Sequence, residues 1–324
     1  MNHTLGRLAV ALLLAVGAAL AQAAPAADPD VAVQAKHVTT DRKELAKLAA
    51  YVDATSDVPD WGRILTDFRE KYGTKILQGE KLTSLGVARD VDILTDADRL
   101  DKVLADPAPL PDVDPAAKAL SAALRKLAPI SHELQNYGAS NGFLVDKGAK
   151  AHALGKPYMD ALQAVADAQD DLANRLGARD LPLVAAAFLR APKDSVLYYA
   201  AGMTYYGKRN VLDGRALFRV PENTAVLAAY QKSLEQFAAM ASSWDKEMMK
   251  DRPQGCVGRM VRINFFIGHG REIVDGLQSG EYARRAKKYG EVLTSGRRGG
   301  LESDIMGYFD EYRAVVELEN QQYC

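Results

Sequence analysis

A run of apolar residues at alternating steps of four and three, within residues 223–250, most limits what this chain can fold into. The run consists of Tyr230, Leu234, Phe237, Ala241, Trp244 and Met248. At this spacing the side chains form one narrow stripe along an α-helix, as in helices that pack nearly parallel to a neighbour. Because an apolar stripe must be buried, the segment requires partner helices, and it predicts a bundle rather than a sheet.

The same periodicity recurs along most of the chain, and each such segment predicts another helix with one apolar face. The apolar positions are Leu45, Leu48, Ala49 and Val52; Trp61, Ile64, Leu65, Phe68 and Tyr72; Leu120, Leu124 and Leu127; Tyr158, Leu162, Val165, Leu172 and Leu176; and Ile305, Phe309, Tyr312 and Val316. No segment shows the sustained alternation of a half-buried strand, although residues 74–98 follow neither period and allow short strands. We therefore predict an all-α fold, an antiparallel helical bundle formed as one body or as two packed sub-bundles.

Proline and glycine mark the expected ends of these helices. Residues 105–115 hold four prolines and form the best sub-boundary within a helical domain that spans 39–324. We expect Pro129 to kink or end its helix and Gly177 to cap the helix before it. The sequence Gly155-Lys156-Pro157 predicts a further interruption.

The first 23 residues have the three-part order of an export signal. Arg7 supplies a positive charge, residues 8–20 form an unbroken apolar run, and small residues surround Ala23. The apolar run is shorter than the roughly 20 residues that a membrane span needs. We expect cleavage near Ala23, a periplasmic or secreted protein, and no transmembrane span in the mature chain.

The segment after the signal, residues 24–38, is rich in alanine, proline and aspartate and predicts a disordered lead-in. It begins with Ala24 rather than a lipid-anchoring cysteine, so we expect a soluble product. The formal net charge of the whole chain is −1, which gives no general attraction for nucleic acids. We expect no nucleic-acid partner.

The two cysteines, Cys256 and Cys324, are the only ones in the chain. In an oxidising compartment an even pair favours a disulfide, and two unpaired thiols are the alternative. Neither cysteine has the spacing of a redox centre or of a haem attachment site.

Three segments resemble a known family: LAKLAAYVDATSD at 45–57, LYYAAGMTYYGKRN at 197–210 and INFFIGHGREIVDGLQSGEY at 263–282. Together with the export signal, they resemble the YiiG-like bacterial domain of unknown function. The resemblance implies a helical, exported protein, often lipid-anchored, with no established activity and no catalytic residues. This chain departs from that pattern because it lacks the lipidation cysteine.

His269 and Glu272 are the best candidates for a metal site. They lie one turn apart on a helix, and imidazole with carboxylate is a common metal-ligand set. The segment is similar to the GxHxxE signature of imelysin-like periplasmic proteins, but its glycine falls one residue late. A metal-binding or hydrolytic protein centred on this pair is therefore the alternative function. The simpler interpretation is a partly exposed histidine beside a carboxylate.

Two further clusters could bind a ligand. Tyr199 and Tyr206, seven residues apart within two tyrosine pairs, would form an aromatic patch for a glycan, peptide or lipid, or would pack in the core. A short basic cluster, followed by Arg297 and Arg298, would meet an anionic lipid or polysaccharide, or would form a solvated helix face; it consists of Arg284, Arg285, Lys287 and Lys288.

No catalytic motif is found: HExxH, GxSxG, the Walker loop and the dinucleotide glycine loop are all missing from the sequence. We predict no catalytic residue and no cofactor. The sequence favours a non-enzymatic binding protein whose partner is an envelope protein, lipid or polysaccharide.

Overall fold

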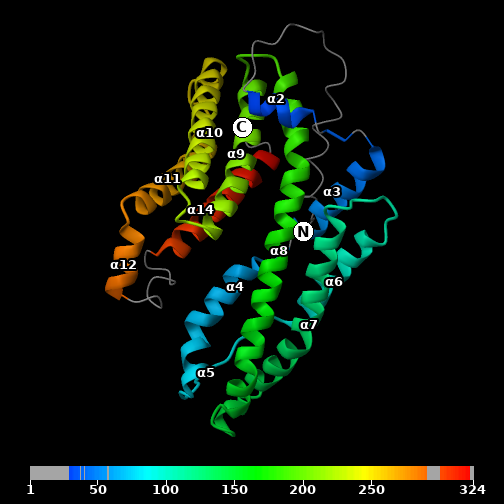
Figure 1. Ribbon diagram of the computed structural model, residues 1–324, viewed down its shortest axis with the longest axis vertical. Helices are drawn as coiled ribbons and strands as arrows, with labels where there is room; N and C mark the ends of the chain where they lie inside the picture. Colours follow the sequence, from blue (N-terminus) through cyan, green and yellow to red (C-terminus); the bar gives the residue numbers. More distant parts are fainter. Residues whose placement is uncertain (1–28, 37, 40, 57, 290–299, 322–324) are drawn as a thin grey trace. The chain divides into compact units, whose positions relative to one another are not determined.

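A computed structural model describes residues 29–36, 38–39, 41–56, 58–289 and 300–321 (Figure 1). The predicted export signal lies outside these residues. The described chain is helical and contains no strand, which confirms the all-α prediction. Where short strands were allowed, the structure has α5 (Thr74–Gln78) and the start of α6 (Asp90–Leu104).

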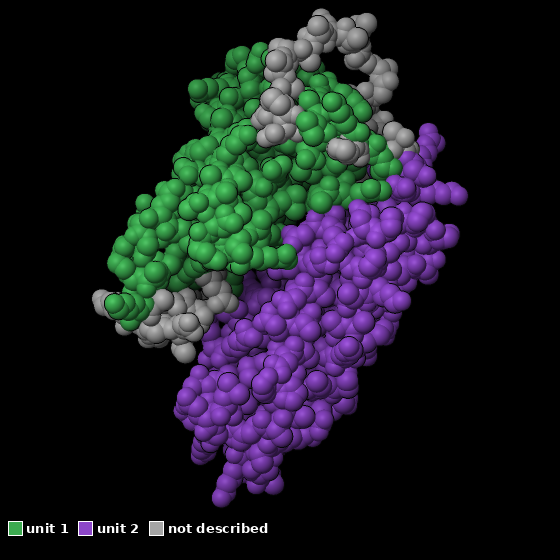
Figure 2. Space-filling model, viewed as in Figure 1, with its two compact units in different colours: residues 1–39, 177–324 green, residues 40–176 purple. Residues whose placement is uncertain are grey.

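The chain divides into two compact units (Figure 2). Unit 1 comprises Met1–Thr39 and Gly177–Cys324, and unit 2 comprises Thr40–Leu176. The division falls within the long helix α8 (Ala149–Arg190), whereas the proline-rich segment 105–115 lies inside unit 2.

Unit 2 packs around the apolar faces that the sequence predicts. Its other elements are α3 (Arg42–Ser56), α4 (Trp61–Phe68), a π-helical turn (Arg69–Gly73), α7 (Asp114–Ala139) and a 3-10 turn (Gly142–Leu144). Leu120, Leu124 and Leu127 of α7 are at most 1% exposed. Leu162 and Val165 of α8 are fully buried. Both helices therefore turn an apolar face toward the interior.

Helix α3 buries a face that only partly matches the predicted one. Leu48 is 5% exposed, as predicted, but Val52 is 38% exposed, while Tyr51 is fully buried and Lys47 is 2% exposed. The Lys47 ammonium donates hydrogen bonds to two carbonyl oxygens of the proline-rich turn, at 3.0 and 2.8 Å, and to Asp114 at 3.0 Å. Tyr51 donates to the same carboxylate at 2.7 Å. A buried ammonium is tolerated because all three of its protons are bonded, and it fastens α3 to the turn before α7.

Helices α7 and α8 continue through residues at which the sequence predicted breaks. Pro129 lies inside α7, and Gly155, Pro157 and Gly177 lie inside α8. At Gly155 a Cβ atom would clash with Cγ2 of Ile76, so this glycine allows α5 to approach α8. It marks a close contact rather than a helix end.

Unit 1 confirms the apolar stripe of residues 223–250. Its elements are α2 (Pro29–Ala35), the rest of α8, α9 (Val196–Arg219), α10 (Thr224–Asp251), α11 (Val257–Gln278), α12 (Glu281–Tyr289) and α14 (Leu301–Asn320). All six stripe residues lie on α10 and are at most 9% exposed. They pack with α11 and α14 in one apolar cluster.

Two details of unit 1 differ from the sequence predictions. Tyr308 and Val315 are the most buried apolar residues of α14, at 0% and 5% exposed, whereas Phe309 and Tyr312 pack at the edge of the cluster. The segment 24–38, predicted to be disordered, includes helix α2, and its Val31 is fully buried in the cluster. No described helix is long and apolar enough to cross a membrane.

Candidate functional site

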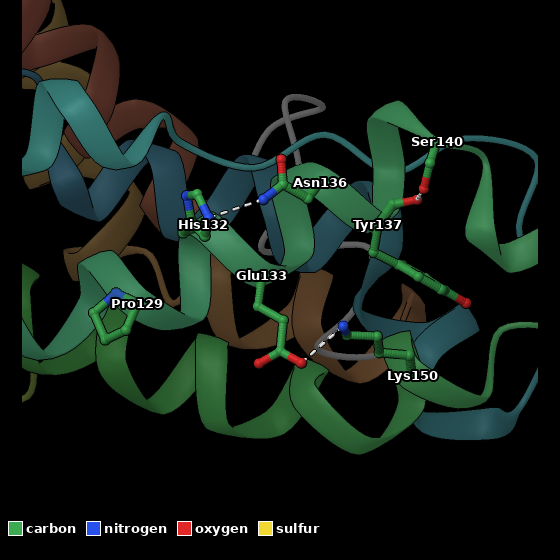
Figure 3. A pocket seen from close by; sticks show the side chains of 7 residues that line it. All are labelled: Pro129, His132, Glu133, Asn136, Tyr137, Ser140 and Lys150. Atoms are coloured by element: carbon green, nitrogen blue, oxygen red, sulfur yellow. Dashed lines mark hydrogen bonds and ion pairs between the residues drawn. The ribbon is translucent and has the colours of Figure 1, made fainter.

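The candidate site is an open groove of about 500 Å³ between α7 and α8, within unit 2 (Figure 3). Its lining is Pro129, His132, Glu133, Asn136, Tyr137, Ser140 and Lys150. Five of these residues belong to α7 and Ser140 caps its C-terminus; they recur at helical spacing and so share one face. The groove is therefore built on rigid helices, and most of its lining side chains are polar.

Glu133 and Lys150 form an ion pair across the groove. Their charged atoms lie 2.8 Å apart, and the two side chains are half-exposed (Figure 3). Such a pair contributes about 0–1 kcal/mol to stability, because water competes for both charges. A ligand can therefore replace it at little cost.

His132 is hydrogen-bonded through both ring nitrogens. Nδ1 lies 2.8 Å from a carboxylate oxygen of Asp90, and Nε2 lies 2.9 Å from the amide nitrogen of Asn136. Since a carboxylate only accepts, Nδ1 carries the proton and donates it, and Nε2 accepts from the amide. The hydrogen bond from His132 holds the pKa of the Asp90 carboxyl below its usual value. The lone pair that a general base would use is thus already bonded to an amide.

Tyr137, which lines the groove, is hydrogen-bonded to Asp146 in the segment before α8. The Tyr137 hydroxyl donates to Asp146, and burial together with this hydrogen bond raises the pKa of Tyr137 to about 12. Asp146 also accepts from the backbone N–H groups of Gly148 and Lys150, at 2.9 and 3.0 Å. A single aspartate therefore bonds the first turn of α8 and sets where Lys150 projects.

The sequence matches one known protein family over residues 42–311. The match covers most of the chain, including the whole groove. The chain belongs to the DUF3829 family. Its members are described only as proteins of unknown function, and the narrower YiiG-like resemblance stays a prediction. Comparisons with curated proteins and with solved structures found no match.

The DUF3829 match covers both residues of the predicted metal site, His269 and Glu272, which lie on α11 in unit 1. Nδ1 of His269 lies 3.4 Å from a carboxylate oxygen of Glu272, and the Glu272 side chain is 67% exposed. In the described part of the chain, no group of three or more His, Cys, Asp or Glu side chains is placed to hold a metal ion. Metal binding at this pair stays a prediction.

The predicted tyrosine site is divided between the surface and the core. Tyr206 is 4% exposed and packs edge-on against Phe188. Tyr199 is partly exposed, and its hydroxyl donates to Asp194 at 3.0 Å. Tyr206 therefore offers a ligand almost no surface, and a ligand site at these two residues stays a prediction.

The other predicted features lie partly outside the described residues. Cys256 is 1% exposed at the start of α11, but Cys324 is not described, so their pairing stays a prediction. In the basic cluster, Arg285 forms an ion pair with Glu281 and Arg284 donates to a backbone carbonyl. These two arginines have partners within the fold.

The sequence did not predict the groove, because its lining residues and their hydrogen-bond and ion-pair partners come from three helices, α6, α7 and α8. The chain folds back between α7 and α8, where His132 bonds Asp90 of α6, and Nδ1 of His152 lies 2.6 Å from the Ile76 carbonyl oxygen. The available signal was the polar stripe on α7, next to the buried leucines of the same helix.

Proposed function

We propose that this protein is an exported binding protein that holds an envelope polysaccharide in the α7–α8 groove. The observation that carries the proposal is the lining: His132, Asn136 and the Glu133–Lys150 pair present donors and acceptors together, on rigid helices. Sugar hydroxyls both donate and accept, so a glycan satisfies such a mixed surface.

Other ligand classes fit this lining less well. An acyl chain would leave the polar groups without partners, which costs about 1–3 kcal/mol for each buried group. A phosphate-rich polymer would meet the carboxylates of Glu133 and Asp90 as well as Lys150. A neutral, hydroxyl-rich chain avoids both costs.

The location of the protein is part of the proposal. The charged start, apolar run and small residues of positions 1–23 favour export, and cleavage near Ala23 would release the chain outside the cytoplasm. An oxidising compartment would also favour the disulfide between Cys256 and Cys324. Mass spectrometry of the extracytoplasmic fraction tests the cleavage site, and a full-length chain found in the cytoplasm would contradict it.

A binding role rather than catalysis is supported by His132. Its Nε2 lone pair accepts from Asn136, and the only hydroxyls in the lining, those of Ser140 and Tyr137, bond elsewhere. A serine hydrolase would need a hydroxyl hydrogen-bonded to this nitrogen.

Co-sedimentation with purified, insoluble peptidoglycan tests the proposal. We expect the wild-type protein to sediment with it and the double variant Glu133→Ala/Asn136→Ala to bind about tenfold or more weakly, since each lost hydrogen bond is worth about 1 kcal/mol. The matched control is Asp160→Asn, which removes an exposed ion pair with Lys156 on α8 outside the groove. Absent binding by the wild type, or equal loss in variant and control, would refute the groove as a glycan site.

A further inference from the structure

Helix α11 exposes apolar side chains on one face. Val257, Val261 and Phe265 recur at steps of four and are 65%, 43% and 52% exposed. Met249, at the end of α10, is also exposed. A contiguous exposed apolar stripe on a helix marks a surface that another molecule covers.

A groove of about 430 Å³ lies beside this stripe, between α10 and α11 of unit 1. Its lining is Ala238, Ala241, Ser242, Asp245, Met260, Asn264, Ile267, Gly268 and Arg271. Small residues predominate on the α10 side, so the groove has room for side chains from outside.

No described residue of unit 1 requires a glycine at position 268. Among the described residues, a Cβ atom there would have no neighbour within 4 Å, whereas one at Gly270 would lie 2.7 Å from Leu234. Glycine weakens a helix interior, and here no internal contact explains it. The open position allows a close approach by another chain.

The two ends of the groove carry opposite charges. Asp245 lies in the C-terminal half of α10, and Arg271 in the C-terminal half of α11. Glu235 near the start of α10 pairs with Arg271 near the end of α11, so the two helices run antiparallel and the two charges lie at opposite ends. Within the described residues Asp245 has no hydrogen bond or ion pair, and Arg271 uses only Nε and Nη2 to bind Glu235.

We propose that a second copy of this chain docks on this face, related by a two-fold axis that crosses α10 and α11 near their middle. A two-fold contact repeats each interaction twice and requires a self-complementary surface. Opposite charges at the two ends meet this requirement, because the axis brings Arg271 to the end that holds Asp245 of the partner subunit. Val261 then faces the open position at Gly268 of the partner subunit.

Sedimentation velocity of the purified protein tests the proposal over about a hundredfold range of concentration, because dimerisation follows mass action. We expect a wild-type dimer and a Gly268→Leu monomer that is folded by circular dichroism, since a Cβ atom at this position has no described neighbour within 4 Å in its own unit. A wild-type monomer at every concentration would overturn the proposal and point to a different protein as the occupant.

A charge exchange gives a second test that does not depend on Gly268. Asp245→Arg should weaken the dimer at least about tenfold, because it places two cations together. The triple variant Asp245→Arg/Arg271→Glu/Glu235→Arg, which keeps opposite charges at positions 235 and 271, should restore it. The matched control is Asp53→Arg on α3, an exposed aspartate of unit 2, which should leave the dimer unchanged. A dimer that tolerates Asp245→Arg, or a triple variant that stays monomeric, would refute the arrangement.

Discussion

Alanine at two neighbouring glycines of α11 should change the stability of unit 1 in opposite directions. Gly268 and Gly270 lie two residues apart in the same helix, so the gain in helix propensity is the same, about 1 kcal/mol for each. The surroundings differ. A Cβ at Gly268 meets open space, whereas one at Gly270 comes within 2.7 and 2.8 Å of the two Cδ atoms of Leu234.

The sign at Gly270 depends on whether Leu234 can move. Leu234 belongs to α10 and is fully buried in the apolar cluster of unit 1, so its side chain has no open space to enter. Overpacking of this kind costs about 1–3 kcal/mol, and the tight contact places it in the upper part of that range. We expect Gly268→Ala to raise the free energy of unfolding by about 0.5–1 kcal/mol and Gly270→Ala to lower it by about 1–2 kcal/mol.

Urea unfolding followed by tryptophan fluorescence measures this difference. The chain has two tryptophans, Trp61 in unit 2 and Trp244 in unit 1, both buried. A Trp61→Phe background leaves Trp244 as the reporter of unit 1, and low protein concentration removes any contribution from self-association. Equal stability of the two alanine variants would refute the argument that packing, rather than helix propensity, determines the glycine at position 270.

Three further predictions concern unit 2 and the cysteines. Lys47→Met should destabilise unit 2 by about 2–3 kcal/mol in urea unfolding followed by Trp61 fluorescence, because it leaves buried acceptors unpaired, and an unchanged midpoint would contradict this role. Burial alone would raise the pKa of the Asp114 carboxyl, but hydrogen bonds from Lys47 and Tyr51 lower it below its usual value. The free energy of unfolding of unit 2, measured against pH, should therefore be constant above about pH 5 and fall as the pH drops below about 4. The fall should be weaker in the Asp114→Asn variant. Titration of the unfolded, unreduced protein should find no thiol at Cys256 or Cys324, and two thiols would exclude their disulfide.

The sequence predicts helices more accurately than it predicts their faces and ends. The stripe of α10 is confirmed because alternating steps of four and three identify both the helix and its buried side. On α3 the same reasoning selected Val52, but Tyr51 and Lys47 are buried instead. Apolar periodicity cannot anticipate a lysine whose acceptors are carbonyl groups of a turn about sixty residues later in the chain.

Glycine and proline misled the prediction for a related reason. They are locally unfavourable in helices, and the sequence shows only that local cost. At Gly155 the structure shows the compensating contact, the approach of Ile76 from α5.

For the candidate site, too, the sequence determines the polar helix face but not the residues that pair with it. Periodicity places the polar residues of the groove on one face of α7, so a polar surface on that helix is determined by the sequence alone. The partners of these residues are decided only by tertiary structure, since Asp90 comes from α6 and Lys150 from α8.

The sequence by itself determined that this chain is helical, which residues of α10 are buried and which known catalytic motifs are missing, because each depends on residue type and spacing over a few turns. Only the tertiary structure decided where the two units divide, which charges pair in the groove and which glycine of α11 is left uncovered. Each of these depends on a neighbour that is distant in sequence, and local periodicity carries no information about that neighbour.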